Sequence, residues 1–256
     1  MMTTQRLVSI ITGVLIILII LPITLSLWLA HRQAHELFDQ ELNNYAARVM
    51  ARSERVKQQT RTALEEVNRF RGETCSLAHL RQLQKMSYIH QYVQSVFYLD
   101  NAVHPCAMLS NSLGEKVPDS EFTAPGGYQV WLMSRHDLQT DDKMVAVSNG
   151  RYVAIVDPDS LIDVLPHPHY PIHAALIGTK GHQVITSNAP IDADFWQKNL
   201  HVFQSTIEKD GVVYHQQLLP TVGAILLTWS SVQPMESSLR HQLMIWVPLG
   251  ILLSLI

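Results

Sequence analysis

A long uncharged run near the amino terminus constrains the architecture more than any other feature of the sequence. Residues 7–30 read LVSIITGVLIILIILPITLSLWLA, and none of them carries a charge. About 20 apolar residues cross a bilayer as a helix, and the glycine and proline within this run are tolerated in membrane helices. The alternative is a cleaved signal peptide, but bulky Trp28 would then stand where cleavage needs a small residue. We expect residues 1–6 to be cytoplasmic and residues 7–30 to form the first transmembrane helix.

A second apolar run, LMIWVPLGILLSLI, ends the sequence at residue 256. It is shorter than the roughly 20 residues that span a bilayer, so we expect residues 242–256 to be the start of a second transmembrane helix that is truncated. A short buried helix is the alternative. The two runs enclose residues 31–241, which suffice for one domain with a helical stalk. Flanking charges scarcely favour either orientation. From the length and cysteines of this segment we expect it to be periplasmic, between the two membrane helices of a multi-pass protein.

Residues 31–72 are predicted to form one long helix that serves as a stalk. Neither glycine nor proline occurs between residue 31 and Gly72, and apolar side chains recur at steps of mostly three or four residues. Such spacing indicates a helix with one apolar stripe, which consists of Phe38, Leu42, Tyr45, Val49, Val56, Ala63, Val67 and Phe70. Two uses of the stripe remain open, namely packing on the chain's own domain and pairing in a homodimer. We expect the membrane-proximal part to pair and the distal part to pack on the domain.

The sequence after the stalk predicts an α+β fold with a small mixed or antiparallel sheet. Thr74 is the expected N-cap of a short helix, and the aromatic and β-branched residues within 88–99 indicate a strand. Residues 101–127 are rich in loop-forming residues, and a short helix is expected over 193–199. Further strands are expected over residues 128–133, 144–147, 152–156, 174–177, 183–186, 212–218 and 224–228. The arrangement is typical of extracytoplasmic PAS-like or Cache-like sensor domains, a likeness of fold that says little about function.

Two cysteines, Cys75 and Cys106, are the only ones in the chain. In an oxidising compartment an isolated pair is either a structural disulfide or a redox switch, and both alternatives remain open. Cys75 is predicted at the start of a helix, where a thiolate is stabilised. A disulfide between the two would contribute about 3.5 kcal/mol by chain entropy. A third alternative is a Cys2His2 metal site that adds His79 and His104.

The sequence contains no motif that indicates catalysis. A glycine-rich phosphate loop, an HExxH motif and a GxSxG motif are all absent. We therefore expect these residues to contain no catalytic residue, no resident metal and no cofactor. The net charge of −3 gives no reason to expect a nucleic-acid partner.

The segment TCSLAHL at 74–80, followed by a tyrosine-rich strand and a second cysteine, resembles the periplasmic CSS-motif sensory domain. The segment RYVAIVDPDSLIDVLP at 151–166 resembles it too, and the resemblance covers essentially the whole chain. In that family a cytoplasmic EAL domain follows the second membrane helix and hydrolyses cyclic di-GMP with Mg²⁺ or Mn²⁺. The family's second cysteine opens a Cys-Ser-Ser triplet, whereas this sequence has Cys106-Ala107-Met108.

The resemblance implies that Cys75 and Cys106 form a redox pair, with Ser76 and His79 as neighbouring motif residues. The oxidised pair would hold the phosphodiesterase back, and reduction would release it and make the periplasmic part prone to proteolysis. The implied partners are a second copy of the chain, bound through the stalk and membrane helices, and periplasmic thiol oxidoreductases and proteases. Because the EAL domain is missing from these residues, we expect no hydrolysis by this chain itself.

A different function also fits the sequence. The chain would then be a Cache-like sensor that binds a small molecule, and the disulfide would be only structural. The expected pocket residues come from 128–131 and 152–156, two of the predicted strands.

Overall fold

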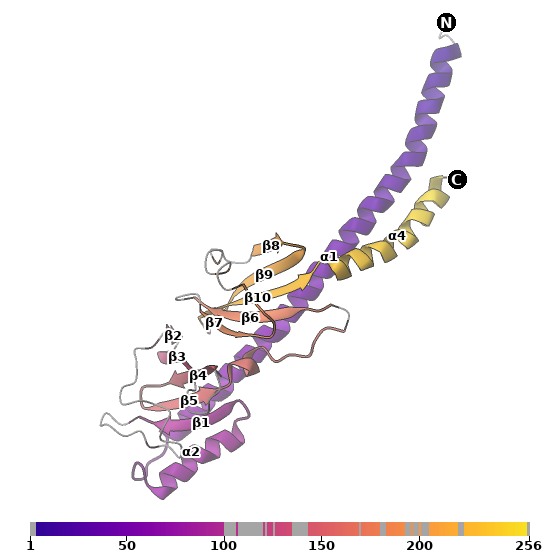
Figure 1. Ribbon diagram of the computed structural model, residues 1–256. Coiled ribbons are helices and arrows are strands. Elements are labelled where there is room, and N and C mark those ends of the chain that lie inside the picture. Colours follow the sequence, from indigo (N-terminus) through magenta and orange to yellow (C-terminus); the bar gives the residue numbers. More distant parts are fainter. Residues whose placement is uncertain are drawn as a thin grey trace.

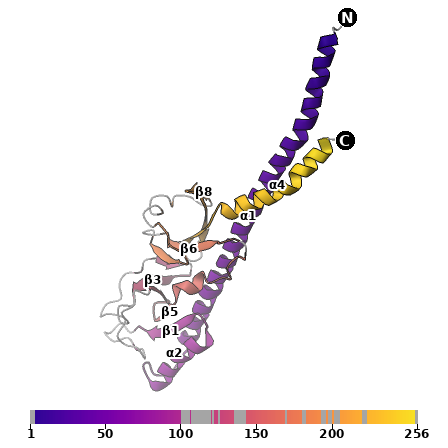
Figure 2. The ribbon, with the colours of Figure 1, turned by 45° about the vertical axis from the view of Figure 1, so that its right-hand side comes forward.

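A computed structural model describes residues 4–99, 106, 120, 122–124, 126–134, 143–168, 170–179, 183–192, 196, 200, 205–219 and 223–254. Figure 1 shows one long helix with two β-sheets arranged along it, and Figure 2 shows both sheets on the same side of the helix. The two termini lie at the same end of the molecule. A structural change at the other end can therefore reach the termini through the long helix or through the nearer sheet.

The long helix, α1 (Thr4–Asn68), confirms the predicted stalk helix but ends before residue 72. The chain tightens after it, because the N–H groups of Arg69 and Phe70 bond to carbonyl groups three residues back. Every member of the predicted stripe from Phe38 to Val67 is buried. The largest core lies between this stripe and the inner faces of both sheets. The stripe is therefore used for packing within the chain, which is the first of the two predicted uses.

A second helix, α4 (Gln233–Ser254), packs against the amino-terminal part of α1. The indole Nε1 of Trp246 donates a hydrogen bond to Oε1 of Gln33 over 3.2 Å. The small side chains of Ala30 and Ala34 are buried on α1. This helix pair belongs to one chain, and pairing with a second copy stays a prediction.

Two five-stranded antiparallel sheets, rather than one small sheet, form the body of the protein. The distal sheet has the order β1-β5-β4-β3-β2 and the proximal sheet the order β7-β6-β10-β9-β8. The distal strands are β1 (Val93–Tyr98), β2 (Phe122–Ala124), β3 (Tyr128–Ser134), β4 (Lys143–Ser148) and β5 (Tyr152–Val156). The proximal strands are β6 (His173–Gly178), β7 (Val184–Ser187), β8 (Ser205–Lys209), β9 (Val212–Leu219) and β10 (Ala224–Ser231). The single-sheet prediction was wrong because turn signals identify neighbouring strands without showing which hairpins share a sheet.

Each strand predicted between residues 128 and 228 is present, although its ends shift by a residue or more in most cases. The strand predicted over 88–99 starts too early, because Tyr88 and Ile89 belong to the helix α2 (Leu77–Ile89). The N-cap of α2 is Ser76 rather than the predicted Thr74. Strands β2 and β8 were not predicted at all.

Two predictions fall largely on residues that the structure does not describe. In the segment predicted as a short helix, 193–199, Trp196 alone is described, and it is helical. In the loop predicted over 101–127, the described part contains β2 and an isolated β-bridge at Cys106. The rest of both segments lies outside the described residues.

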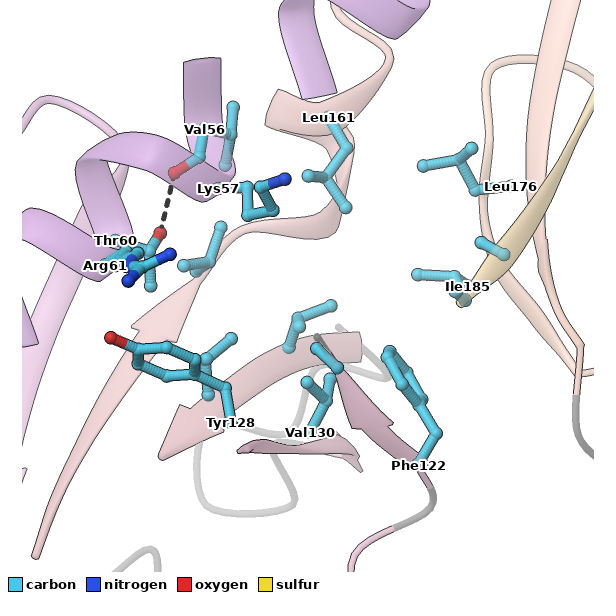
Figure 3. A pocket seen from close by; sticks show the side chains of 15 residues that line it. Val56, Lys57, Thr60, Arg61, Phe122, Tyr128, Val130, Leu161, Leu176 and Ile185 are labelled. Carbon is cyan, nitrogen blue, oxygen red and sulfur yellow. Dashed lines mark hydrogen bonds between the residues drawn. The ribbon is translucent and has the colours of Figure 1, made fainter. Parts of the chain in front are cut away.

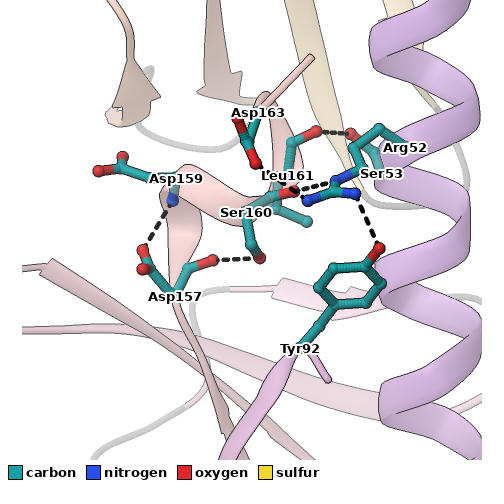
Figure 4. Close-up of polar contacts among 8 residues, drawn as sticks. All are labelled: Arg52, Ser53, Tyr92, Asp157, Asp159, Ser160, Leu161 and Asp163. Atoms are coloured by element: carbon teal, nitrogen blue, oxygen red, sulfur yellow. Dashed lines mark hydrogen bonds and ion pairs between the residues drawn. The ribbon is translucent and has the colours of Figure 1, made fainter. Parts of the chain in front are cut away.

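A polar side chain on α1, Arg52, fixes the connection between the two sheets to the helix (Figure 4). This connection contains the short 3₁₀ helix η2 (Pro158–Leu161), which follows β5 and precedes β6. Arg52 Nε donates to the carbonyl oxygen of Ser160 over 3.0 Å, and Nη1 donates to Oη of Tyr92 over 2.8 Å. The guanidinium group also lies 4.6 Å from the centre of the Tyr92 ring. The junction of the sheets is therefore tied to one point on α1.

The same connection is also tied to the proximal sheet. Asp157 caps η2, because its carboxylate accepts the N–H of Asp159 over 2.9 Å. The carboxylate of Asp159 in turn accepts a hydrogen bond from the hydroxyl of Thr186 on β7. The acidic residues of this segment therefore serve as turn and capping groups.

Within the described residues, no helix combines the length and the apolar character that a membrane crossing requires. The transmembrane helices predicted over 7–30 and from residue 242 are thus not confirmed.

Replacing Arg52 by methionine should lower the free energy of unfolding by about 2 kcal/mol, because Ser160 and Tyr92 each lose a partly buried hydrogen bond to a charged group. Asp163→Asn is the matched control. The Asp163 side chain is 75% exposed, so its 3.1 Å ion pair with Arg52 should be worth less than about 1 kcal/mol. Urea unfolding monitored by tryptophan fluorescence measures both variants. Equal losses would contradict the role assigned to Arg52.

Candidate functional site: a disulfide beside a buried histidine

Cys75 and Cys106 form a disulfide next to the start of α2. Helix α2 lies at the end of the molecule farthest from the termini (Figure 1). Their Cα atoms are 5.6 Å apart, and 31 positions separate them in the sequence. Cys106 lies beside the edge strand β1, where its carbonyl oxygen accepts the N–H of Tyr98 over 3.3 Å. The covalent bond therefore ties the start of α2 to a segment at the outer edge of the distal sheet.

The backbone around Cys75 is held in a conformation that favours glycine. Its φ angle is 61°, in the left-handed region. The N–H of Cys75 donates to Nδ1 of His79 over 3.0 Å. One residue later, Oγ of Ser76 accepts the N–H of His79 over 3.2 Å and so caps α2. The predicted motif residues Ser76 and His79 thus both fix the backbone next to the first cysteine.

His79 is fully buried, with no exposed surface. Its Nδ1 accepts a hydrogen bond from Cys75, so the ring proton must lie on Nε2, which is 3.1 Å from Oη of Tyr152. This arrangement suits the neutral imidazole. Burial lowers the pKa of His79 from its ordinary value of 6.5, which agrees with that assignment.

Three aromatic rings surround the His79 imidazole. Phe70 stacks on it with the ring centres 4.7 Å apart. Tyr98 and Tyr152 approach it edge-on at 5.3 Å and 5.8 Å. Because these rings come from the segment after α1, from β1 and from β5, His79 connects the first cysteine to the end of the long helix and to two strands of the distal sheet.

The chemistry that this arrangement supports is the formation and reduction of a disulfide. A neutral His79 supplies no positive charge to a Cys75 thiolate, so the start of α2 is the local feature that favours the thiolate. Cys75 precedes the N-cap by one residue, close to the position that the sequence predicted. The sequence did not reveal the aromatic surroundings of His79, because Phe70 and Tyr152 are distant along the chain and carry no motif.

The described residues do not gather into a metal-binding group of three or more histidine, cysteine or acidic side chains. Cys75 and Cys106 are bonded to each other, and both ring nitrogens of His79 have hydrogen-bond partners. His104, the fourth member of the Cys2His2 set that the sequence suggested, lies outside the described residues.

The residues predicted to line a ligand pocket divide among three places. Tyr128, Val130 and Val156 line an apolar cavity of about 180 Å³ between α1 and the two sheets (Figure 3). Tyr152 instead belongs to the surroundings of His79. Trp131 packs in a separate cluster with Phe97 and other apolar residues. Most of the cavity wall comes from other elements. The sequence did not reveal this cavity, because it did not predict that two sheets meet there.

Residues 38–239 match the protein family described as "CSS motif domain associated with EAL". A curated relative from Escherichia coli (strain K12), "Probable cyclic di-GMP phosphodiesterase PdeB", is 38% identical over 260 residues and matches 100% of this chain. The chain spans 50% of the length of that relative.

Two solved structures resemble the chain at low identity. An extracellular ligand binding receptor from Desulfohalobium retbaense DSM5692 is 11% identical with a TM-score of 0.45, over 76% of this chain and 40% of that one. The extracellular domain of a proposed histidine kinase, vpHK1S-Z8, is 13% identical with a TM-score of 0.44, over 84% of this chain and 95% of that one.

Acidification should weaken the fold partly through His79. Because its pKa is lowered in the folded state, its contribution to stability is complete above pH 6.5 and is lost as the pH falls from there towards the lowered value. His79→Gln should therefore flatten the fall in unfolding free energy below pH 6.5. The exposed His241→Gln is the control, and denaturant titrations at a series of pH values give the slopes. A slope unchanged by His79→Gln would refute the assignment, and the residual slope should include His215, whose pKa burial also lowers.

The left-handed backbone at Cys75 can be tested without the disulfide. We compare Cys75→Gly with Cys75→Ala, each combined with Cys106→Ser. The glycine variant should be more stable by about 0.5 to 1 kcal/mol, because relief of the positive φ outweighs the greater entropy of its unfolded chain. Thermal and urea unfolding measure the difference. Greater stability of the alanine variant would mean that this turn relaxes once the disulfide is lost.

Proposed function

The chain belongs to the CSS-motif domain family, and we propose that it is the periplasmic redox-sensing input module of a membrane-bound cyclic di-GMP phosphodiesterase. The family description associates the domain with EAL, and the relative that matches the whole chain bears the name of a cyclic di-GMP phosphodiesterase. The output domain would be an EAL domain that these 256 residues do not include, with its own Mg²⁺ or Mn²⁺. The apolar run over 7–30 would anchor the module in the bacterial inner membrane.

The observation that carries this proposal is the pairing of Cys75 with Cys106. Among the described contacts of Cys106 with the body of the domain are the disulfide and the backbone hydrogen bond from Tyr98. Closing a loop of this length is worth about 3.5 kcal/mol by chain entropy, whereas one backbone hydrogen bond contributes about 1 kcal/mol. Reduction would therefore release the segment around Cys106 from the sheet edge.

Release of this segment need not unfold the distal end. Helix α2 buries Leu83 and Met86 in a core with Val67 of α1 and Val93 of β1. These contacts persist when the disulfide is reduced, because none of them involves a cysteine. Reduction would thus shift the population between two arrangements of a folded domain, which is the behaviour of a switch.

The path to the output would start at His79. Its aromatic neighbours include Phe70, just after the end of α1, so a change in the Cys75 turn alters the packing of that end. Helix α1 would transmit the change to its pairing with α4, next to the membrane. A second copy of the chain, bound through these helices, and periplasmic thiol oxidoreductases and proteases are the proposed partners.

A chimera tests the proposal. The corresponding half of the Escherichia coli relative is replaced by this chain, and hydrolysis of cyclic di-GMP is measured in membranes over a series of dithiol redox buffers. Alkylation of free thiols is followed in the same samples. We expect hydrolysis to rise on reduction with the midpoint of the thiols, above about −250 mV. Cys75→Ser and Cys106→Ser should give the reduced level of activity at every potential.

The variant Arg52→Met is the control, because it loosens the domain without touching the cysteines. It should leave the midpoint potential unchanged. A midpoint below about −300 mV would mark a structural disulfide and refute redox sensing. Hydrolysis that is equal in oxidised and reduced membranes would refute it as well.

A further inference from the structure

The apolar cavity lies where three parts of the protein meet, and it is separate from the disulfide. Helix α1 forms one wall, the inner face of the distal sheet a second, and strands β6, β7 and β10 of the proximal sheet a third. In Figure 3, Tyr128 and Phe122 stand on one side, and Leu176 and Ile185 face them from the proximal sheet. A molecule in this cavity would touch both sheets and the helix at once.

The two sheets come close together beside the cavity. A Cβ atom placed on Gly223, just before β10, would lie 2.8 Å from the Phe122 ring on β2. Gly223 also has a φ angle of 64°, which only glycine adopts easily. This close contact holds the two sheets together at one side of the cavity. The width of the cavity on its other side depends on how each sheet packs against α1.

The size of the cavity suits a small organic molecule. Its volume of about 180 Å³ exceeds the roughly 150 Å³ of an engineered apolar cavity that binds benzene. The wall consists mainly of aliphatic side chains, among them Val130, Val147 and Val156. Such a surface favours an apolar group of about the size of a phenyl ring.

Two cations stand on the α1 wall of this apolar cavity, Lys57 and Arg61, and no acidic side chain is among its described lining residues. Both cations are engaged in ion pairs on the helix surface. Lys57 Nζ lies 2.6 Å from Glu54, and Arg61 Nε lies 2.8 Å from Glu65. Partly and fully exposed pairs of this kind are worth about 1 kcal/mol or less, so a ligand anion can compete for the cations.

We propose that this cavity binds a small monocarboxylate whose apolar body fills the space between the sheets and whose carboxylate meets Lys57, with Arg61 beside it. The apolar wall recognises the body, and the cations recognise the charge. The bound molecule bridges the distal and proximal sheets. The proposal is independent of the redox function, because no lining residue belongs to the disulfide or to the surroundings of His79.

The test uses the full 256-residue chain in lipid nanodiscs, with titration calorimetry and subtraction of the heat into empty nanodiscs. The probes are 3-phenylpropionate and its neutral amide. We expect saturable binding of the carboxylate, with the amide bound about fivefold more weakly. Lys57→Met should weaken the carboxylate about fivefold and leave the amide unchanged. The matched control, Lys85→Met on the exposed face of α2, should change neither.

Two further variants separate ligand binding from folding. Glu54→Gln removes the carboxylate that competes for Lys57, so it should strengthen binding of 3-phenylpropionate. Val147→Phe should fill the cavity and abolish binding of both probes, and Ala124→Leu serves the same purpose if the first variant does not fold. Circular dichroism and the intact disulfide report folding.

Several results would overturn the proposal. These are the absence of saturable heat with 3-phenylpropionate in the unmodified chain, equal affinity for acid and amide, and equal effects of Lys57→Met and Lys85→Met. Unimpaired binding in a folded variant with a filled cavity would overturn it too. None of these results bears on the redox titration, which reports the cysteines alone.

Discussion

The packing of two separate sheets on one continuous helix is the constraint on which the rest of the structure depends. Each sheet buries its inner face mainly against the stripe of α1, from Phe38 near the proximal sheet to Val67 near the distal one. A fully buried aliphatic or aromatic side chain contributes about 1.5 to 3 kcal/mol, so the stripe as a whole is too costly to expose. The sheets can therefore tilt or slide on α1 more readily than they can leave it.

Because the sheets can shift along α1, the few contacts that hold them at one position on the helix determine their arrangement. Arg52 binds the connection between the sheets from a position between Val49 and Val56 of the buried stripe, through hydrogen bonds to Ser160 and Tyr92. The disulfide acts at the far end and differs in kind, because a redox reaction can remove it without replacing any side chain. Under the proposed redox function, the domain would have two arrangements, and the contacts of Arg52, which reduction leaves in place, would limit how far these differ.

The sequence predicted the elements better than their assembly. The stripe of α1 and the short strands follow from local periodicity, which survives in the structure. Tyr88 and Ile89 were assigned to a strand because of their residue types, yet they are 80% and 52% exposed at the end of α2. Because these two apolar side chains do not face a core, their positions do not reveal the period of the secondary structure that contains them. For the site, Cys75, Ser76 and His79 were found from a local motif. The rings around His79 and the cavity between the sheets depend on long-range contacts that no local pattern records.

The course of the chain determines how either candidate site can act on the paired helices α1 and α4. Strand β10 leads through Val232 directly into α4, so a displacement of the proximal sheet would be passed to α4. Reduction of the disulfide, as proposed, would act first on the far end of α1. The cavity lies between these two bodies, with Lys57 on α1 and Ala224 at the start of β10 among its walls. A molecule that bridges them would oppose relative sliding of α1 and α4, whatever the state of the cysteines. A redox change at the disulfide and a molecule bound in the cavity would thus both affect the sliding of α1 against α4. Their effects on this sliding would therefore be coupled.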